Sequence, residues 1–218
     1  RTAAEVLAEL RQAVLDGRVL ALKGLGGFQL VVDATNADAV ARLRRRKRRP
    51  HKPLALMISS LEEVRRRCAV SDEEAGVLAS HQAPILLLRR TAPAGERPAQ
   101  PDDGPADDVA EGVAPGNPYL GVMLPYTPLH HLLMAALRRP VVCTSGNLSE
   151  EPMAIETEDA LARLGPIADV FLVHDRPIVR PVDDSVARIG PAGLEVLRRA
   201  RGFAPLPLGL GRSGPSGS

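Results

Sequence analysis

A basic segment is the first part of this sequence that could do chemistry. Residues 42–52 carry eight Lys or Arg in eleven positions, although the net charge of the whole chain is only +2. Such a concentration in a near-neutral protein indicates a binding site for an anion. Lys47 and Arg49 stand two apart before Pro50, so in an extended chain both would point the same way and bind one phosphate group. The alternative is an exposed basic helix end that complements the helix dipole; Pro50 and Pro53 fix the backbone and favour the binding site.

A run of small polar residues is the second candidate. The apolar stretch 141–144, which ends at Thr144, is followed by Ser145, Gly146 and Asn147. Ligands of open α/β sheets bind at the carboxyl ends of strands. There Ser145 and Asn147 would supply a hydroxyl and an amide, and Gly146 would let the backbone approach the ligand. An ordinary turn has the same composition. A nucleophilic serine is disfavoured because no GxSxG pattern surrounds Ser145.

Three further stretches have a structural interpretation beside a functional one. Lys23 precedes the glycine-rich residues 24–27, which permit close approach to an anion, although a tight turn between strands is favoured. Asp183 and Asp184 stand between arginines, which fits either an ATP–metal site or a salt-bridged loop. Adjacent His130 and His131 face different directions on a helix and are a poor metal pair, so His130 is expected to be buried or to cap the helix.

Alternating helices and strands must position these residues. Hydrophobic periodicity and caps predict helices over residues 3–16, 37–48, 61–68, 71–80, 129–137 and 157–164. Strands are predicted over residues 19–23, 28–32, 54–58, 85–89, 141–144, 170–173 and 186–189. The alternation is typical of one α/β domain over residues 1–208, followed by a disordered Gly/Ser-rich tail over 209–218. Residues 91–112 are rich in Pro, Gly and Asp and are expected to form a flexible loop.

The composition excludes several classes of protein. With 44% hydrophobic and 25% charged residues, the chain is typical of a globular protein and can bury a full core. Its two Cys and five His have no metal-ligand spacing, so no metal site made by protein ligands is expected. No apolar run is long enough to span a membrane and no signal peptide is apparent. We therefore expect a soluble, cytoplasmic protein with reduced cysteines.

Several long motifs, in this order, resemble one known family. They are KGLGGF and DATN within residues 23–36, KRRPHKPLA at 47–55, VAPG at 113–116, GVMLPYTPLHHLL at 121–133, TSGNLSEEP at 144–152, HDRPIVRPVDDSVAR at 174–188 and RARGFAP at 199–205. The set resembles the YrdC-like domain of the hydrogenase maturation carbamoyltransferase (HypF) family. The resemblance covers about residues 5–207. Gln29 stands where that family usually has His, which leaves the role of this position open.

This resemblance implies a specific reaction. Such a domain uses ATP and Mg²⁺ to adenylate a carbamoyl group from carbamoyl phosphate or carbamate, which gives carbamoyl-adenylate and pyrophosphate. Other domains of the family, namely an acylphosphatase, zinc fingers and a carbamoyl-transfer domain, do not occur in this sequence. The carbamoyl-transfer domain passes the carbamoyl group to the C-terminal Cys of a hydrogenase maturation partner. The chain is thus expected to form the adenylate without completing the transfer, on a twisted α/β sheet with a basic concave face.

The resemblance also implies roles for single residues. Lys47, Arg49 and Ser145 would be catalytic, with Lys47 and Arg49 binding the triphosphate and its developing charge, while Ser145 and Asn147 bind phosphate oxygens and the acyl-adenylate. The remaining residues expected in the nucleotide pocket are Lys23, Thr144, Arg180, Asp184 and Ser185. Mg²⁺ would be held mainly through ATP.

Three other functions stay open at this level. A threonylcarbamoyl-adenylate synthase would share the motifs around Lys47 and Ser145 but require threonine and hydrogen carbonate. An O-carbamoyltransferase of antibiotic pathways would have a similar nucleotide domain. A double-stranded RNA or tRNA-binding module would use the basic segment 42–52 on phosphates. Aromatic residues for base stacking are scarce, at 2%, which disfavours the RNA-binding function.

Overall fold

The computed structural model describes residues 2–91, 109–148 and 151–207. Its helices are α1 (Ala3–Leu15), α2 (Ala37–Lys47), α3 (Leu61–Arg65), α4 (Asp72–Leu78), α5 (Pro128–Leu137), α6 (Thr157–Leu164) and the 3₁₀ helix η2 (Glu111–Val113). Its strands are β1 (Leu20–Lys23), β2 (Phe28–Asp33), β3 (Leu56–Met57), β4 (Ile85–Arg89), β5 (Tyr119–Met123), β6 (Val141–Ser145), β7 (Val170–Leu172), β8 (Val186–Gly190) and β9 (Gly193–Arg198).

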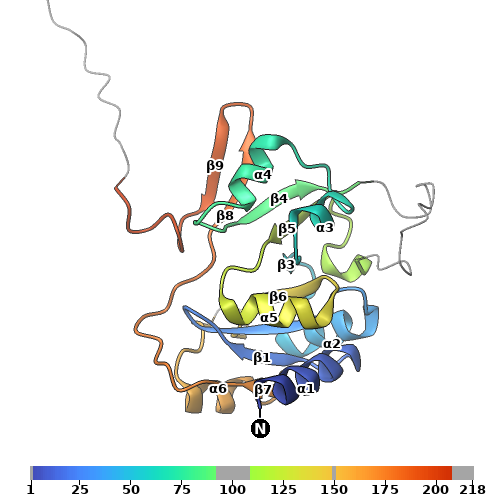
Figure 1. Cartoon of the computed structure of the whole chain (residues 1–218), viewed down its shortest axis with the longest axis vertical. Helices are drawn as coiled ribbons and strands as arrows, with labels where there is room; N and C mark the ends of the chain where they lie inside the picture. Colours follow the sequence, from blue (N-terminus) through green and yellow to red (C-terminus); the bar gives the residue numbers. More distant parts are fainter. Residues whose placement is uncertain (1, 92–108, 149–150, 208–218) are drawn as a thin grey trace, which may run out of the picture.

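One mixed sheet joins all the strands of the described residues. Its order is β7-β1-β2-β6-β3-β5-β4-β8-β9, and Figure 1 shows it running from β7 beside α1 up to the β8–β9 hairpin. The pairs β1–β7, β3–β5 and β4–β8 are parallel, and the other neighbours are antiparallel. The middle strand, β3, is only two residues long. Leu56 and Met57 pair with β6 on one side and with β5 on the other.

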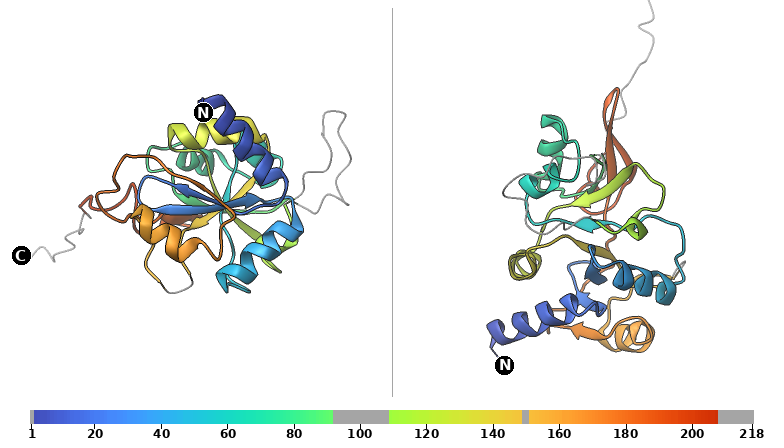
Figure 2. Two further views of the ribbon diagram at one scale, coloured as in Figure 1. Left: turned by 90° about the horizontal axis from the view of Figure 1, so that it is seen from below. Right: turned by 90° about the vertical axis from the view of Figure 1, so that its right-hand side faces the viewer.

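Two layers of helices cover the half of the sheet that contains β1, β2 and β6. The view from below in Figure 2 shows α1 and α5 on one face and α2 and α6 on the other. Val14 and Leu133 belong to the core under α1 and α5, whereas Leu43 and Leu164 belong to the core under α2 and α6. Each fully buried aliphatic side chain contributes about 1.5–3 kcal/mol.

Local signals explain where the key helices begin and end. The Asn36 side chain accepts a hydrogen bond from the Ala39 N–H and starts α2. Arg48 ends α2 in the left-handed conformation, at φ 53°. Thr127 caps α5 by accepting from the His130 N–H, and Pro128 occupies the first turn, where no N–H is needed. The end of α2 and the start of α5 place the basic segment and His130 near the end of β6.

The predicted α/β class and most predicted elements are confirmed, with four differences. Strands β5 and β9 were not expected. The strand predicted over 54–58 is reduced to Leu56–Met57, and the helix predicted over 61–68 ends at Arg65. The loop expected over 91–112 falls mostly on 92–108, which lies outside the described residues, as does the expected tail 209–218. At the end of that loop Val109 is buried and η2 begins at Glu111.

No helix within the described ranges is long and apolar enough to cross a membrane.

Candidate functional site

A cavity of about 450 Å³ lies on the face of the sheet that α1 and α5 cover. Ile85, Cys143 and Val186 line it and belong to the side chains of that face. Alternate residues of the strands form its floor because side chains of a strand alternate between the two faces. The apolar lining residues are Pro53, Leu54, Ala55, Ile85, Leu87, Tyr119, Gly121, Cys143, Val186 and Leu197. The polar lining residues are Arg49, Lys52, Asn117, Thr144, Ser145, Asp183, Asp184 and Arg198. A flat uncharged group and an anion would both find matching surfaces here.

The basic side of the cavity is a loop that a buried arginine holds in place. The Arg44 guanidinium donates to the carbonyls of Arg49, Pro50 and Lys52, at 2.7, 3.1 and 3.2 Å. It also donates to the Gly112 carbonyl at 2.5 Å. The loop therefore keeps one shape, and Arg49 and Lys52 line the cavity from it. Arg44 of the basic segment thus fixes the loop, and Arg49 and Lys52 face the cavity.

Lys47 and Arg49 have different hydrogen-bond partners. A left-handed turn at Arg48 replaces the expected extended exit, and Arg49 donates to the Pro53 carbonyl at 2.8 Å. Lys47 is only 1% exposed, and its Nζ donates to the carbonyls of Ser145 and Asn147, at 2.6 and 2.5 Å, and to Asn147 Oδ1 at 2.8 Å. Burial, followed by the charge of Arg49, lowers the pKa of Lys47 to about 7, against the opposing charge of Asp183. Lys47 therefore supports the Ser145–Asn147 turn from behind the cavity wall.

The turn after β6 is held by its own polar groups. Ser145 Oγ donates to Asn147 Oδ1 at 2.8 Å, and Asn147 Nδ2 donates to the Glu151 carbonyl at 2.6 Å. A Cβ at Gly146 would lie 2.7 Å from the Phe28 carbonyl oxygen, to which the Gly146 N–H donates. The expected close approach at Gly146 is thus made by the neighbouring strand β2. Ser145 keeps its hydroxyl at the edge of the cavity.

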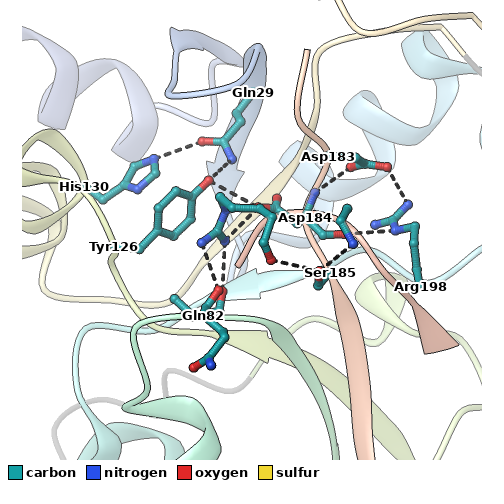
Figure 3. Close-up of polar contacts among 11 residues, drawn as sticks. Gln29, Gln82, Tyr126, His130, Asp183, Asp184, Ser185 and Arg198 are labelled. Atoms are coloured by element: carbon teal, nitrogen blue, oxygen red, sulfur yellow. Dashed lines mark hydrogen bonds and ion pairs between the residues drawn. The ribbon is translucent and has the colours of Figure 1, made fainter. Parts of the chain in front are cut away.

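Two aspartate–arginine pairs form the opposite side of the cavity (Figure 3). Asp183 Oδ2 lies 2.8 Å from Arg198 Nη1, and Asp184 Oδ1 lies 2.9 Å from Arg201 Nη2. The guanidinium carbon of Arg201 also lies 3.5 Å from the centre of the Tyr126 ring. The carboxylates are therefore neutralised by their partners, and the net charge of the rim comes from Arg49 and Lys52.

A buried chain of hydrogen bonds continues from Asp184 through the sheet, as Figure 3 shows. The Tyr126 hydroxyl donates to Asp184 Oδ1 at 3.3 Å, and Gln29 Nε2 donates to the Tyr126 hydroxyl at 2.8 Å. His130 Nε2 lies 2.9 Å from Gln29 Oε1. Burial lowers the pKa of His130 to about 4 and raises that of Tyr126, so both rings are neutral near pH 7. The expectation that His130 is buried is confirmed.

The structure brings together only part of the expected site. Arg49, Thr144, Ser145 and Asp184 line the cavity, with Lys47 and Asn147 directly behind it. The other three expected residues do not line this cavity. Arg180 is exposed, and Lys23 lines a separate cavity. Ser185 is fully buried, where its Oγ donates to the Arg201 carbonyl and accepts from the Ala200 N–H.

Three residues of the site were not singled out for a role in the pocket. Arg198 lines the cavity, and Tyr126 and Arg201 pack beside it. Tyr126 and Arg201 stand in motifs that carried the resemblance, which was the available signal. Asp183, expected either in an ATP–metal site or in a salt-bridged loop, lines the cavity and pairs with Arg198. Arg198 lies on the unpredicted strand β9.

The arrangement fits phosphate binding and offers little for covalent catalysis. Cys143 is buried in the wall of the cavity, and burial raises the pKa of its thiol, which removes its nucleophilic form. Ser145 donates to an amide oxygen, which is not a base. Within the described residues, no group of three or more His, Cys, Asp or Glu could hold a metal ion. Cations, a hydroxyl and backbone turns remain, and these bind and orient anionic groups.

Comparisons with known proteins agree on one family. The family model of Sua5, YciO and YrdC proteins, described as "Telomere recombination", matches residues 12–200. The carbamoyltransferase HypF of Synechocystis sp. is 47% identical over 213 residues, which make up 94% of this chain and 26% of that protein. HypF of Rhodobacter capsulatus is 50% identical over 194 residues, 88% of this chain and 24% of that protein. The chain thus spans about a quarter of the length of these curated relatives.

Solved structures give the same answer. The crystal structure of full-length HypF in the phosphate- and nucleotide-bound form superposes with a TM-score of 0.84 at 44% identity, covering 92% of this chain and 30% of that one. Sua5 of P. abyssi complexed with L-threonine has a TM-score of 0.75 at 19% identity, with coverages of 92% and 55%, and shares the fold. The chain therefore belongs to the Sua5/YciO/YrdC family, as a YrdC-like domain whose sequence and fold match one part of the carbamoyltransferase HypF.

Proposed function

We propose that this domain binds ATP in the 450 Å³ cavity and adenylates a carbamoyl group, as one part of a hydrogenase maturation carbamoyltransferase. The observation that carries the proposal is the placement of Arg49, Lys52, Thr144 and Ser145 around one cavity. The chain that holds this cavity is 44% identical to a HypF whose structure is nucleotide-bound. A volume of about 450 Å³ lies in the usual range of small-molecule sites, about 300–1,000 Å³.

The chemistry needs positioning and charge neutralisation more than a nucleophile in the protein. A carbamate oxygen attacks the α-phosphorus of ATP, the bond to the β-phosphate oxygen breaks, and pyrophosphate leaves with that bonding pair. Arg49 and Lys52 neutralise the phosphate oxygens, and the Ser145 hydroxyl turns from Asn147 to donate to one of them. Lys47 holds the turn that presents Ser145. Mg²⁺ would travel with the phosphates, and Asp183 on the cavity rim would have to leave Arg198 to help hold it.

The partners follow from the same proposal. ATP and carbamate are the substrates of the step above, and carbamoyl phosphate would supply that carbamate after water has released its phosphate. The carbamoyl-adenylate is consumed by a transfer domain, and the final acceptor is the C-terminal Cys of a maturation protein in the cytoplasm.

Pyrophosphate release tests the proposal. The domain is incubated with ATP, Mg²⁺ and either carbamoyl phosphate or a mixture of hydrogen carbonate and ammonium, which supplies carbamate. We expect pyrophosphate release that falls at least tenfold in Arg49→Ala and in Ser145→Ala. The matched control is Arg65→Ala, which removes an exposed arginine outside the cavity.

Two outcomes would contradict the proposal. Equal rates in the wild type, Arg49→Ala and Ser145→Ala would exclude the cavity as the site. Release that requires threonine together with hydrogen carbonate would assign the domain to threonylcarbamoyl-adenylate synthesis. Tight binding of double-stranded RNA that ATP does not compete with would favour a binding module instead.

A further inference from the structure

A second cavity, of about 240 Å³, lies on the other side of the glycine-rich turn between β1 and β2. Its walls are that turn, the first turn of α5 and the segment after β7. The lining residues are Lys23, Gly24, Leu25, Thr127, Pro128, Leu129, His130, His174, Arg176, Pro177 and Ile178. None of them lines the 450 Å³ cavity. The two cavities thus have different linings, although a small pocket between them is lined by Leu25 of the second cavity and by Ser145, Asp183 and Asp184 of the first.

The titratable side chains of this second cavity are all basic. Lys23 and Arg176 supply the cations and His174 an imidazole, His130 is neutral near pH 7, and no Asp or Glu of the described residues lines the cavity. Asp175, between His174 and Arg176 in the sequence, is exposed and points elsewhere than into the lining. This distribution gives the cavity a positive potential.

Lys23 is the centre of this potential. It is only 6% exposed, and its Nζ donates to the His174 carbonyl at 3.0 Å and to Thr157 Oγ1 at 3.3 Å. An ammonium group has three protons to donate, and these two acceptors are uncharged. No salt bridge joins Lys23 to an acid in the described part of the chain. A buried cation without a counter-ion is unfavourable, and an anion in the cavity would offset that cost.

Two other features of the wall point to the same ligand. The ten-residue helix α5 begins at the cavity, so the positive end of its dipole faces the site. The Nδ1 atom of His174 is buried with no hydrogen-bond partner among the described residues. The Nδ1 atom of His130 is buried in the same way, but the His130 Nε2 proton is donated to Gln29 Oε1, so this Nδ1 accepts and suits an oxyanion that carries a proton, such as hydrogen carbonate. Polar groups that the protein does not satisfy by itself are rare and mark places completed by an ion, a water or a ligand.

We propose that this cavity binds a small oxyanion, of the size of phosphate or hydrogen carbonate, independently of the nucleotide. Its volume of about 240 Å³ is below the range of about 300–1,000 Å³ typical of drug-sized ligands, so it suits a small anion better than a nucleotide. Lys23 supplies the buried charge and Arg176 an exposed one at the mouth. The proposal stands whether or not the larger cavity binds ATP, because the two cavities share no lining residue.

The test measures anion binding while the larger cavity is filled. Inorganic phosphate and, separately, ¹³C-labelled hydrogen carbonate are titrated into the domain in the presence of a saturating non-hydrolysable ATP analogue. Binding is followed by calorimetry and by NMR line broadening. We expect saturable binding of at least one of the two anions, weakened at least tenfold in Lys23→Met and several-fold in Arg176→Gln. Arg65→Gln, which removes one exposed charge away from both cavities, is the matched control.

Each outcome decides the matter. Arg176 is exposed, so Arg176→Gln will fold even if Lys23→Met does not. The proposal is overturned if neither anion binds saturably. It is also overturned if Arg176→Gln and a folded Lys23→Met both bind the anions as tightly as the wild type does. If Lys23→Met instead loses affinity for the ATP analogue, Lys23 belongs to the nucleotide site and the proposal is wrong. The anion that binds in this assay identifies the natural class, phosphate or carbonate.

Discussion

Lys47 connects the basic segment to the turn after β6, and its protonation is linked to whatever anion that turn binds. Its Nζ donates to three oxygens of Ser145 and Asn147, and its pKa is about 7. At pH 8 most of the Lys47 side chains are therefore neutral in the free protein. A triphosphate beside Ser145 favours the charged form and raises that pKa.

ATP binding at pH 8 is accordingly expected to take up a proton. With a pKa of about 7 the uptake by Lys47 approaches one proton per site, because about nine-tenths of the side chains start neutral. Calorimetry in buffers of different ionisation enthalpy measures this number. Lys47→Met should abolish the uptake, whereas Lys52→Met, which removes a lysine from the same rim, should retain it. Equal uptake in the wild type and Lys47→Met would contradict the role of Lys47.

His130 makes stability depend on pH. Its pKa in the folded protein, about 4, lies below the ordinary value of 6.5, so the unfolded chain takes up the proton first as pH falls. The stabilisation is fully present above pH 6.5 and is lost between pH 6.5 and 4, by up to about 3 kcal/mol for a shift of this size. Urea unfolding at pH 4.5, 5.5 and 6.5 should show a shallower pH dependence in His130→Gln. An exposed histidine that does not act on His130 provides the control, since His51→Gln should leave the slope unchanged.

The site residues could be predicted where one short motif supplies both the residue and its surroundings. Ser145 and Arg49 do line the cavity, and each follows directly from the end of an element that the sequence predicts. Lys23 was expected beside the nucleotide, and only the path of β1 shows that its side chain enters the second cavity. Side-chain direction depends on tertiary packing at these positions, and a sequence motif does not contain it.

At the scale of elements, the segment after β9 is fastened to the start of β8. Ser185 is the fastening residue: its Oγ joins the Arg201 carbonyl at 2.9 Å and the Ala200 N–H at 2.8 Å. Arg201 then reaches Asp184 and the carbonyl of Ala83. This segment therefore holds the acidic side of the cavity in position.

Ser185→Ala should be costly although the change is small. It leaves one backbone donor and one backbone acceptor without their partner, at about 1–3 kcal/mol for a buried unsatisfied group. The free energy of unfolding measured in urea checks this value. Ser59→Ala, at an exposed position, should stay within about 0.5 kcal/mol of the wild type. A loss of equal size in both variants would show that Ser185 has no fastening role.

The elements missed in the sequence share a physical reason. Strand β9 lies at the edge of the sheet and exposes several of its residues, so it lacks the alternation of a half-buried strand. In β5, Gly121 interrupts the apolar run because a Cβ there would meet Ile85 at 3.0 Å. The core strands and amphipathic helices were predicted because burial on one face imposes a period on their sequence.

At the scale of the molecule, the larger cavity gathers segments that are far apart in the chain. Its lining comes from residues 49–55, 85–87, 117–121, 143–145, 183–186 and 197–198. A ligand held by all of them binds only the folded state. At a concentration 1,000 times its dissociation constant, ATP should therefore raise the free energy of unfolding by about 4 kcal/mol.

Thermal unfolding at increasing ATP concentration measures this stabilisation. Arg49→Ala should lose most of it at the same ATP concentration, and Arg65→Ala should retain it. An ATP effect that Arg49→Ala leaves intact would place the nucleotide elsewhere on the domain.

The two-residue strand β3 has a mechanical consequence. Four strands lie on each side of it in the sheet order, and Leu56 and Met57 are the only β3 residues that pair with both halves in the described structure. The two halves of the sheet are thus joined at β3 by two-residue pairings only. Ser145 ends β6 in one half, and Asp183 lies just before β8 in the other. A nucleotide that contacts both residues would therefore connect the two halves, bracing the sheet at β3. Slower amide exchange at Leu56 and Met57 in the presence of ATP would be the signature of that bracing.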